Sequence, residues 1–134
     1  MKRKGRIINK KNIFSKLLYL NLIAHSSVTF KRNKAGIKNF FYDEEYFYAQ
    51  DYNLILRYFR DSKIEFIDEK LVRIRDYDGN MSNTQWYAKI RIIETLKLLE
   101  FSKKNFKLNF FDKIKIKYFK YKYRLKLLWI NMGE

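Results

Sequence analysis

The sequence of 134 residues contains no cysteine and no proline, and it has only four glycines. The absence of cysteine excludes a disulfide framework and a thiolate metal site, and it fits a reducing cytoplasm. No uncharged apolar stretch reaches the roughly 18 residues that a membrane span needs. The basic N-terminus lacks the apolar core and the cleavage site of a secretion signal. We therefore expect one cytoplasmic domain with a modest core.

Acidic residues are scarce and unevenly distributed. Residues 1–40 contain none, and of the 14 in the chain only Asp112 and Glu134 lie outside the span from Asp43 to Glu100. With 30 lysines and arginines against 14 acidic residues, the formal net charge of the chain is +16. Basic ends of this kind predict an anionic partner, which is nucleic acid, an anionic membrane or a phosphate-bearing substrate.

The segment 48–54 reads Tyr-Ala-Gln-Asp-Tyr-Asn-Leu and begins a helical pattern. Asp51 is expected in the first turn, where free backbone N–H groups and the macrodipole favour a carboxylate. Two interpretations stand: Asp51 caps the helix, or it accepts a proton from a bound hydroxyl group. The apolar residues of one helix face follow at the helical period: Tyr52, Ile55, Leu56 and Phe59.

Three further blocks surround this segment. Residues 21–28 read Asn-Leu-Ile-Ala-His-Ser-Ser-Val, residues 69–75 read Glu-Lys-Leu-Val-Arg-Ile-Arg, and residues 78–82 read Asp-Gly-Asn-Met-Ser. In order and spacing, residues 21–85 resemble the C-terminal half of bacterial family 2 glycosyltransferases, which are inverting enzymes of the GT-A fold. That family commonly carries Asn-Pro-Ile-x-His-Ser-Ser-Val, Ala-Gln-Asp-Tyr-Asp-Leu and Pro-Glu-x-Leu-x-x-Tyr-Arg-x-His blocks.

The resemblance implies half of an enzyme, inactive alone, that works with a separate N-terminal half. The complete enzyme transfers a sugar from a nucleotide-sugar donor to a cell-surface glycan or a lipid-linked acceptor. No cofactor is expected in this chain, because the Mg²⁺ or Mn²⁺ ion belongs to the complete enzyme. The resemblance makes Asp51 the general base, and it implies six substrate-binding residues: His25, Ser26, Ser27, Gln50, Tyr52 and Arg75.

The residues themselves leave other interpretations open. A lone histidine beside hydroxyl groups, as at His25, is more often a structural residue than a ligand. The aromatic residues between positions 40 and 48 suit either core packing or a stacking wall for a sugar. Alternation in the segment 72–75 places Arg73 and Arg75 on one strand face. Either arginine can bind a phosphate group, which a guanidinium matches with paired hydrogen bonds. We expect Arg73 in solvent, whereas the resemblance implies that Arg75, at the position of the family's Arg-x-His, binds phosphate.

Two features bear on metal binding. Tyr77 stands where the family has a histidine that is thought to help the metal–diphosphate site. Asp76, Tyr77 and Asp78 spell Asp-x-Asp, a pattern that holds a divalent ion in such enzymes. In the family this pattern precedes the general base, whereas here it follows Asp51 and leads into a Gly-Asn turn pair. We therefore interpret the triplet as a turn and predict no metal site.

The periodicity predicts an α/β chain with few short strands packed with helices, and the resemblance implies that it is the C-terminal half of a GT-A-like fold. A capping box at 82–85 predicts a helix whose apolar face, with Trp86, Ile90, Ile93 and Leu96, packs on a sheet. Strands are expected at three places: 23–30, 63–66 and 72–74. The expected organisation has three parts: a basic arm with a short helix (1–20), a glycosyltransferase-like domain (21–105) and a basic aromatic tail (106–134).

The tail fits two templates, because residues 113–118 alternate as a strand would while a helical pattern persists over about four turns. We predict a basic amphipathic helix with an apolar face of Ile114, Tyr118, Tyr121, Leu125 and Leu128. Its basic stripe consists of Lys113, Lys117, Lys120 and Arg124.

Such a helix suits an anionic membrane surface, here the inner face of the plasma membrane. The alternative is that it docks on this domain or on the missing half. A different class of function is a basic aromatic module that binds nucleic acid or membrane without catalysis. We consider nucleic acid the less favoured partner, because no nucleic-acid-binding motif is visible.

Overall fold

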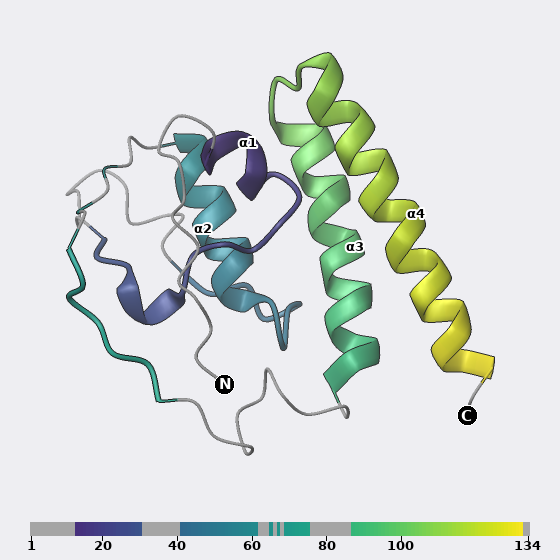
Figure 1. Cartoon of the computed structure of the whole chain (residues 1–134), viewed down its shortest axis with the longest axis horizontal. Coiled ribbons are helices and arrows are strands. Elements are labelled where there is room, and N and C mark those ends of the chain that lie inside the picture. The colour runs from purple at the N-terminus through teal and green to yellow at the C-terminus, as the bar shows by residue number, and fades with distance from the viewer. Residues whose placement is uncertain are drawn as a thin grey trace.

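The computed structural model describes residues 13–30, 41–61, 65, 67, 69–75 and 87–132. Over these residues the regular structure is helical and contains no β-strand. The α/β fold expected from the sequence is therefore wrong for the described part of the chain. The elements follow in the order α1 (Ile13–Leu17), the 3-10 turn η2 (His25–Ser27), α2 (Gln50–Asp61), α3 (Ala88–Asn105) and α4 (Phe110–Met132), as Figure 1 shows.

The strand expected at 23–30 is replaced by the turn η2. The Ser27 N–H donates to the Ala24 carbonyl at 2.9 Å, and the Val28 N–H donates to the His25 carbonyl at 3.1 Å. The Ser27 hydroxyl also donates to the Ala24 carbonyl, at 2.7 Å. Serine side chains that bond to nearby backbone compete with extended structure, so the local hydrogen bonds outweigh the β-propensity of the residues that follow.

The strand expected at 72–74 is also absent, and these residues have no regular structure. Their apolar side chains are largely exposed, with 45% of Val72 and 61% of Ile74 accessible. An alternating pattern becomes a strand only when a neighbouring strand completes its hydrogen bonds. The strand expected at 63–66, of which only Glu65 is described, and the capping box at 82–85 lie outside the described residues.

The helix predicted after Tyr48 is confirmed as α2. Its hydrogen bonding begins with the Asn53 N–H, which donates to the Ala49 carbonyl at 2.9 Å. Asp51 in the first turn and Arg60 in the last turn both suit the helix dipole. The side chains from Tyr52 to Leu56 are all buried, so this short helix lies against other parts of the chain on several sides.

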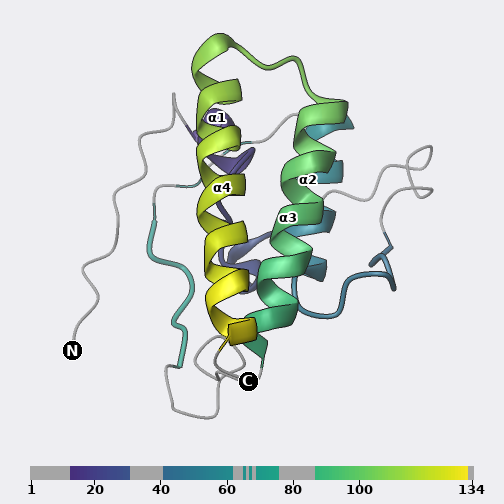
Figure 2. The same cartoon turned by 90° about the vertical axis from the view of Figure 1, so that its right-hand side faces the viewer.

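Helices α3 and α4 form an antiparallel hairpin, which Figures 1 and 2 show side by side. The helix α3 ends where the Phe106 N–H donates to the Ser102 carbonyl at 3.2 Å. The connection 106–109 is short, and Asn109 caps α4 by accepting the Asp112 N–H at 2.7 Å. The hydrogen bond between the Ser15 hydroxyl and the Asp112 carboxylate ties α1 to the beginning of α4.

The core consists of two clusters that meet at Phe106. One joins α2 to α3 through buried side chains: Tyr46, Ala49, Tyr52, Leu56 and Leu98. The other joins the residues after α1 to α3 and α4: Leu18, Tyr19, Leu99 and Ile116. Because α3 is covered by α2 on one side and by α4 on another, its buried residues lie on two neighbouring faces.

The predicted helix α3 is confirmed, but the predicted buried face is only partly right: Leu96 packs against the core, whereas Ile90 and Ile93 are exposed, and Trp86 lies outside the described residues. Ile90 and Ile93 are 38% and 40% exposed, whereas Ile92 and Leu98 are each 1% exposed. No sheet is present among the described residues to cover the predicted face. Figure 1 shows instead that α3 lies between α2 and α4.

The predicted helix α4 is confirmed as well, and the side chains that it packs toward α3 are ones that the sequence did not single out. Ile116 is buried, and Phe119 and Tyr123 are partly buried against the α3 cluster. The predicted apolar face, for example Tyr121 at 64% exposed, points to solvent and does not dock on the described part of the domain. No helix in the described part of the chain is both long enough and apolar enough to span a membrane.

Candidate functional site

Asp51, the predicted general base, lies in the first turn of α2 and is half-buried. One carboxylate oxygen, Oδ1, accepts the Tyr52 N–H at 2.7 Å. First-turn N–H groups have no partner within the helix and readily bind a carboxylate. This contact uses one oxygen atom of Asp51, and the partial exposure of the side chain leaves it accessible from solvent. The position therefore fits both a helix cap and a base that accepts a proton.

The backbone just before α2 is held by Glu94 from α3. The Glu94 Oε1 atom accepts the Phe47 N–H at 2.7 Å, and Oε2 accepts the N–H groups of Tyr48 and Ala49 at 2.8 and 2.7 Å. Glu94 is only 5% exposed. A buried carboxylate requires several donors, and these three amides supply them. The Glu94 carboxylate thus fixes the loop that leads directly to Asp51.

A polar network ties the same loop to the body of α2. Asn53, which is buried, accepts Nε–H of Arg57 through Oδ1 at 2.7 Å. The Arg57 guanidinium also donates to the Phe41 carbonyl at the beginning of the described loop. The Tyr46 hydroxyl bonds to Asn53, although burial is the larger effect and raises the Tyr46 pKa. The loop 41–49 is therefore anchored to α2 as well as to α3.

Tyr52, predicted to bind substrate, lies in the core and is 3% exposed. Its hydroxyl donates to the Leu17 carbonyl at the end of α1, at 2.5 Å. Burial raises the pKa of the Tyr52 phenol well above its ordinary value of 10.0, and Tyr123 adds a smaller effect. In this structure Tyr52 connects α1 to α2 and does not reach solvent.

The predicted substrate-binding residues His25, Ser26 and Ser27 are exposed on the turn η2. The Nε2 atom of His25 lies 2.7 Å from the Tyr42 hydroxyl, and the two rings meet edge to face with centroids 5.9 Å apart. The Tyr42 side chain thus orients the His25 imidazole. In Figure 1 the turn η2, drawn in dark blue, lies at the same height as the beginning of α2, whose second residue is Asp51.

The other two predicted binding residues lie in different surroundings. Gln50 is half-buried at the first position of α2, next to Asp51. Arg75 is exposed at the end of the segment 69–75. The Asp-x-Asp triplet and the segment that follows it lie outside the described residues. In the described part of the chain no three histidine or acidic side chains gather as metal ligands.

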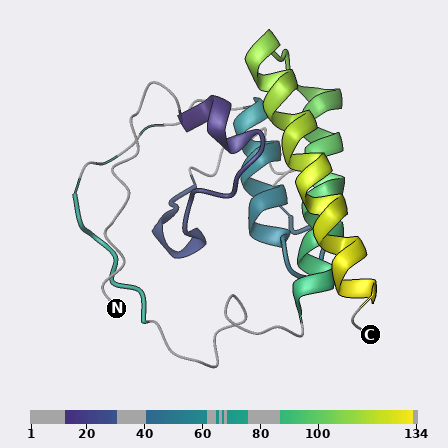
Figure 3. The same ribbon diagram turned by 45° about the vertical axis from the view of Figure 1, so that its right-hand side comes forward.

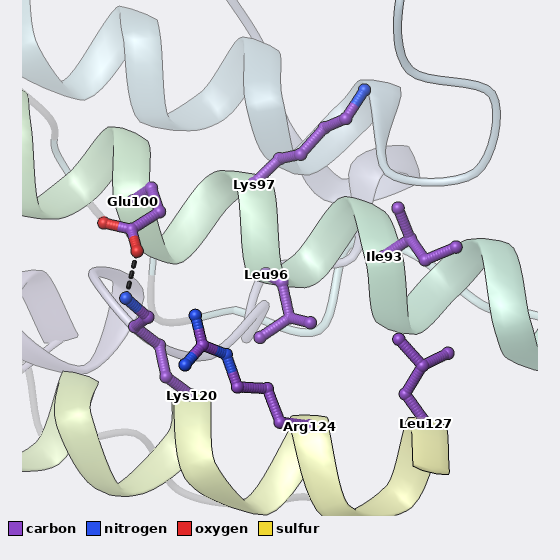
Figure 4. A pocket seen from close by; sticks show the side chains of 7 residues that line it. All are labelled: Ile93, Leu96, Lys97, Glu100, Lys120, Arg124 and Leu127. Carbon is purple, nitrogen blue, oxygen red and sulfur yellow. Dashed lines mark hydrogen bonds and ion pairs between the residues drawn. The ribbon is translucent and has the colours of Figure 1, made fainter. Parts of the chain in front are cut away.

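Two open hollows lie along the seam between α3 and α4, away from the predicted site. The first, of about 320 Å³, is lined by three apolar residues together with four charged ones, Lys97, Glu100, Lys120 and Arg124, as Figure 4 shows. The second, of about 500 Å³, shares Lys120 and Arg124 and adds three further lysines. Neither hollow is lined by any of the predicted site residues.

Sequence analysis did not anticipate two residues that organise the predicted site, Glu94 and Tyr42. Glu94 lies four positions before Leu98 and eight before Ser102, so the three residues share one helix face, and this face is buried. The sequence signal for Glu94 was therefore an acid on the same helix face as a core leucine. The spacing shows that the acid is buried, but it does not identify the amides that it binds. No sequence pattern predicts the contact between Tyr42 and His25.

Comparisons of this chain with protein-family models, with curated proteins and with solved structures found no match.

Proposed function

We propose that this chain provides the acceptor side and the general base of an inverting sugar transfer from a nucleotide-sugar, as its sequence blocks suggest for a relative of family 2 glycosyltransferases. The observation that carries the proposal is the position of Asp51. This carboxylate is partly accessible at the first turn of α2, within the Ala-Gln-Asp-Tyr block, and Glu94 anchors the loop before it. The proposal concerns the chemistry of this site and does not depend on the sheet that the sequence suggested.

In the proposed reaction an acceptor hydroxyl attacks the anomeric carbon of the donor sugar. Asp51 takes the hydroxyl proton as the new carbon–oxygen bond forms, and the nucleoside diphosphate leaves from the opposite face with the bonding electrons. The configuration at the anomeric carbon is therefore inverted. A carboxylate can act as this base because the hydroxyl becomes acidic only as the bond develops.

The surrounding residues have positioning roles in this proposal. Glu94 holds the backbone of residues 47–49, so the loop that leads into Asp51 is in place before the acceptor binds. The His25 imidazole, oriented by Tyr42, offers a polar contact for a sugar hydroxyl at the same end of α2. Gln50 is adjacent to the base, and the Arg75 guanidinium is suited to a phosphate of the donor. Tyr52 supports the site from the core.

A donor-binding part is needed in addition to these residues, because the reaction requires both substrates within near-attack distance of about 3 Å. The test measures sugar transfer from a panel of radiolabelled nucleotide-sugars to lipid-linked and glycan acceptors. The chain is assayed alone and together with the upstream half of a family 2 enzyme, supplied as a separate chain. We expect transfer only in the mixture. Robust transfer by the 134-residue chain alone would show that the division into two halves is wrong.

A further inference from the structure

Helix α4 has two apolar faces, and only one of them is used inside the domain. Ile116, Phe119 and Tyr123 pack toward α3 and the residues after α1. In Figures 1 and 3 no other described helix covers the outer side of α4. That side carries nine large apolar residues, each between 48% and 86% exposed: Phe110, Phe111, Ile114, Tyr118, Tyr121, Leu125, Leu128, Trp129 and Met132.

The exposed apolar residues form one continuous stripe along the helix. Seven of them, which leave out Phe110 and Trp129, are spaced alternately by three and four positions, so they stay on one side of a helix that turns by about 100° per residue. The stripe is centred opposite Ile116 and occupies roughly a third of the circumference. Phe110 and Trp129 widen it beyond the narrow seam of a two-stranded coiled coil. A stripe of this width fits a flat apolar surface better than it fits a single partner helix.

Positive charges border the stripe on both edges. Lys113, Lys117 and Arg124 follow one edge, and Lys115, Lys122 and Lys126 follow the other. The acid of this helix, Asp112, is 5% exposed and binds the Ser15 hydroxyl, so it adds no negative charge to the surface. Long basic side chains beside an apolar stripe can extend sideways to an anionic layer while the stripe is buried.

A surface hollow lies along the edge that Lys113, Lys117 and Arg124 form. The hollow of about 500 Å³ lies there, and five of its lining residues are cationic: Lys103, Lys113, Lys117, Lys120 and Arg124. Lys120 pairs with Glu100, and its hydrogen bond lowers the Glu100 pKa below the ordinary value. Figure 4 shows this pair and Arg124 on the neighbouring hollow. The other four cations make the larger hollow a suitable place for a phosphate headgroup.

We propose that α4 lies flat on an anionic phospholipid bilayer, with its stripe in the boundary between headgroups and acyl chains. The bordering lysines and arginines then contact lipid phosphates on both sides. Trp129 and the tyrosines of the stripe suit this boundary because their rings are apolar with one polar group. A second copy of the chain is a poor occupant, since the same cations would face each other. The proposal is independent of the sugar transfer proposed above, because binding needs neither donor nor acceptor.

The test uses the full chain and co-sedimentation with vesicles of phosphatidylcholine, with and without phosphatidylglycerol. One variant, Leu125→Ser with Leu128→Ser, makes the stripe polar, and its control is Leu71→Ser with Val72→Ser at other exposed apolar positions. Circular dichroism checks that each variant keeps its helix content.

A second pair of variants tests the charges. The double variant Lys117→Gln with Arg124→Gln removes two cations beside the stripe. Its control, Lys70→Gln with Arg73→Gln, removes the same charge from another exposed segment.

We expect binding only to vesicles that contain phosphatidylglycerol. The stripe variant and the cation variant should each lower the partition coefficient by at least about tenfold, while both controls bind like the unmodified chain. In a Trp86→Phe chain, where Trp129 is the remaining tryptophan, brominated acyl chains should quench the fluorescence.

Three results would overturn the proposal. One is vesicle binding that the Leu125→Ser, Leu128→Ser variant does not weaken. Another is the absence of quenching by brominated lipids. The third is tighter binding to a single-stranded oligonucleotide or to an acidic helical peptide than to the anionic vesicles, which would assign the surface to a different class of partner.

Discussion

The Glu94 carboxylate lies 2.7 Å from the backbone nitrogen of Ala49, although the two residues are 45 positions apart. The same carboxylate accepts the N–H groups of Phe47 and Tyr48. These bonds join α3 to the loop that leads into α2, and Asp51 is the second residue of that helix. The position of the proposed base therefore depends on a buried acid in another helix.

Replacing Glu94 should destabilise the protein strongly. In a Glu94→Ala chain three backbone N–H groups lose their acceptor, one of them buried and two partly buried, and we expect the free energy of unfolding to fall by about 3 kcal/mol. The Glu94→Gln chain keeps one acceptor oxygen and should lose roughly half as much. Urea unfolding followed by circular dichroism measures both values.

The matched control for Glu94 is Glu100→Gln, on the same helix. The Glu100 side chain is 52% exposed and pairs with Lys120 at the surface, and exposed pairs contribute less than about 1 kcal/mol. The free energy of unfolding should therefore change little. If Glu100→Gln and Glu94→Ala were equally destabilising, the buried contact with the loop would not be the important one.

The Tyr52→Phe substitution removes the hydroxyl that donates to the Leu17 carbonyl. We expect the free energy of unfolding at neutral pH to fall by about 1–2 kcal/mol, because a buried hydrogen bond is lost and a carbonyl is left unpaired. The Tyr121→Phe substitution is the control, since that side chain is 64% exposed. A Tyr52→Phe chain as stable as the control would contradict the buried bond.

The same tyrosine predicts a pH effect. Burial raises the Tyr52 pKa in the folded chain above the ordinary value of 10.0, so below that pH both folded and unfolded states are protonated and stability is unaffected. Above it only the unfolded state releases the proton, and stability declines by about 1.4 kcal/mol per pH unit for such a group. Urea unfolding between neutral and alkaline pH should show a shallower decline for Tyr52→Phe than for the unmodified chain.

Ser102 offers a stabilising change. Its side chain is 0% exposed in α3, and its hydroxyl has no hydrogen-bond partner among the described residues. A buried hydroxyl without a partner lowers stability, so Ser102→Ala should raise the free energy of unfolding by about 1 kcal/mol. Thermal unfolding would show this as a higher midpoint, whereas a lower midpoint would mean that the hydroxyl has a partner.

The helices could be predicted from the sequence, whereas the strands and the packing faces could not. The period of apolar residues identified α2, α3 and α4, because that period reflects the geometry of a single helix. A strand depends on a second strand, so the alternation at Val72 and Ile74 was not sufficient. In α4 the predicted apolar face was expected on an anionic membrane surface, with docking on the domain as the alternative, and Ile116 and Phe119, which pack inside the domain, were not predicted to do so. A helix with two apolar faces gives no local sign of which one its neighbour covers.

In the candidate site, too, local features could be predicted from the sequence and long-range contacts could not. The sequence correctly placed Asp51 in a first helical turn, since that position follows from local spacing. It did not show that Tyr52, one residue later, turns into the core toward Leu17. The contacts of Glu94 with residues 47–49 join distant parts of the chain, and only the folded structure brings them together.

The most direct test of the proposed function is the single-turnover rate of sugar transfer in the two-part mixture, with Asp51→Asn in place of the unmodified chain. Asparagine retains the size of the side chain and cannot accept the proton, so we expect the rate to fall by about a hundredfold or more with little change in donor binding. The control is Asp43→Asn, which alters another partly exposed carboxylate in the adjoining loop and should leave the rate unchanged. Transfer by the Asp51→Asn mixture at the unmodified rate would contradict the assignment of Asp51 as the general base.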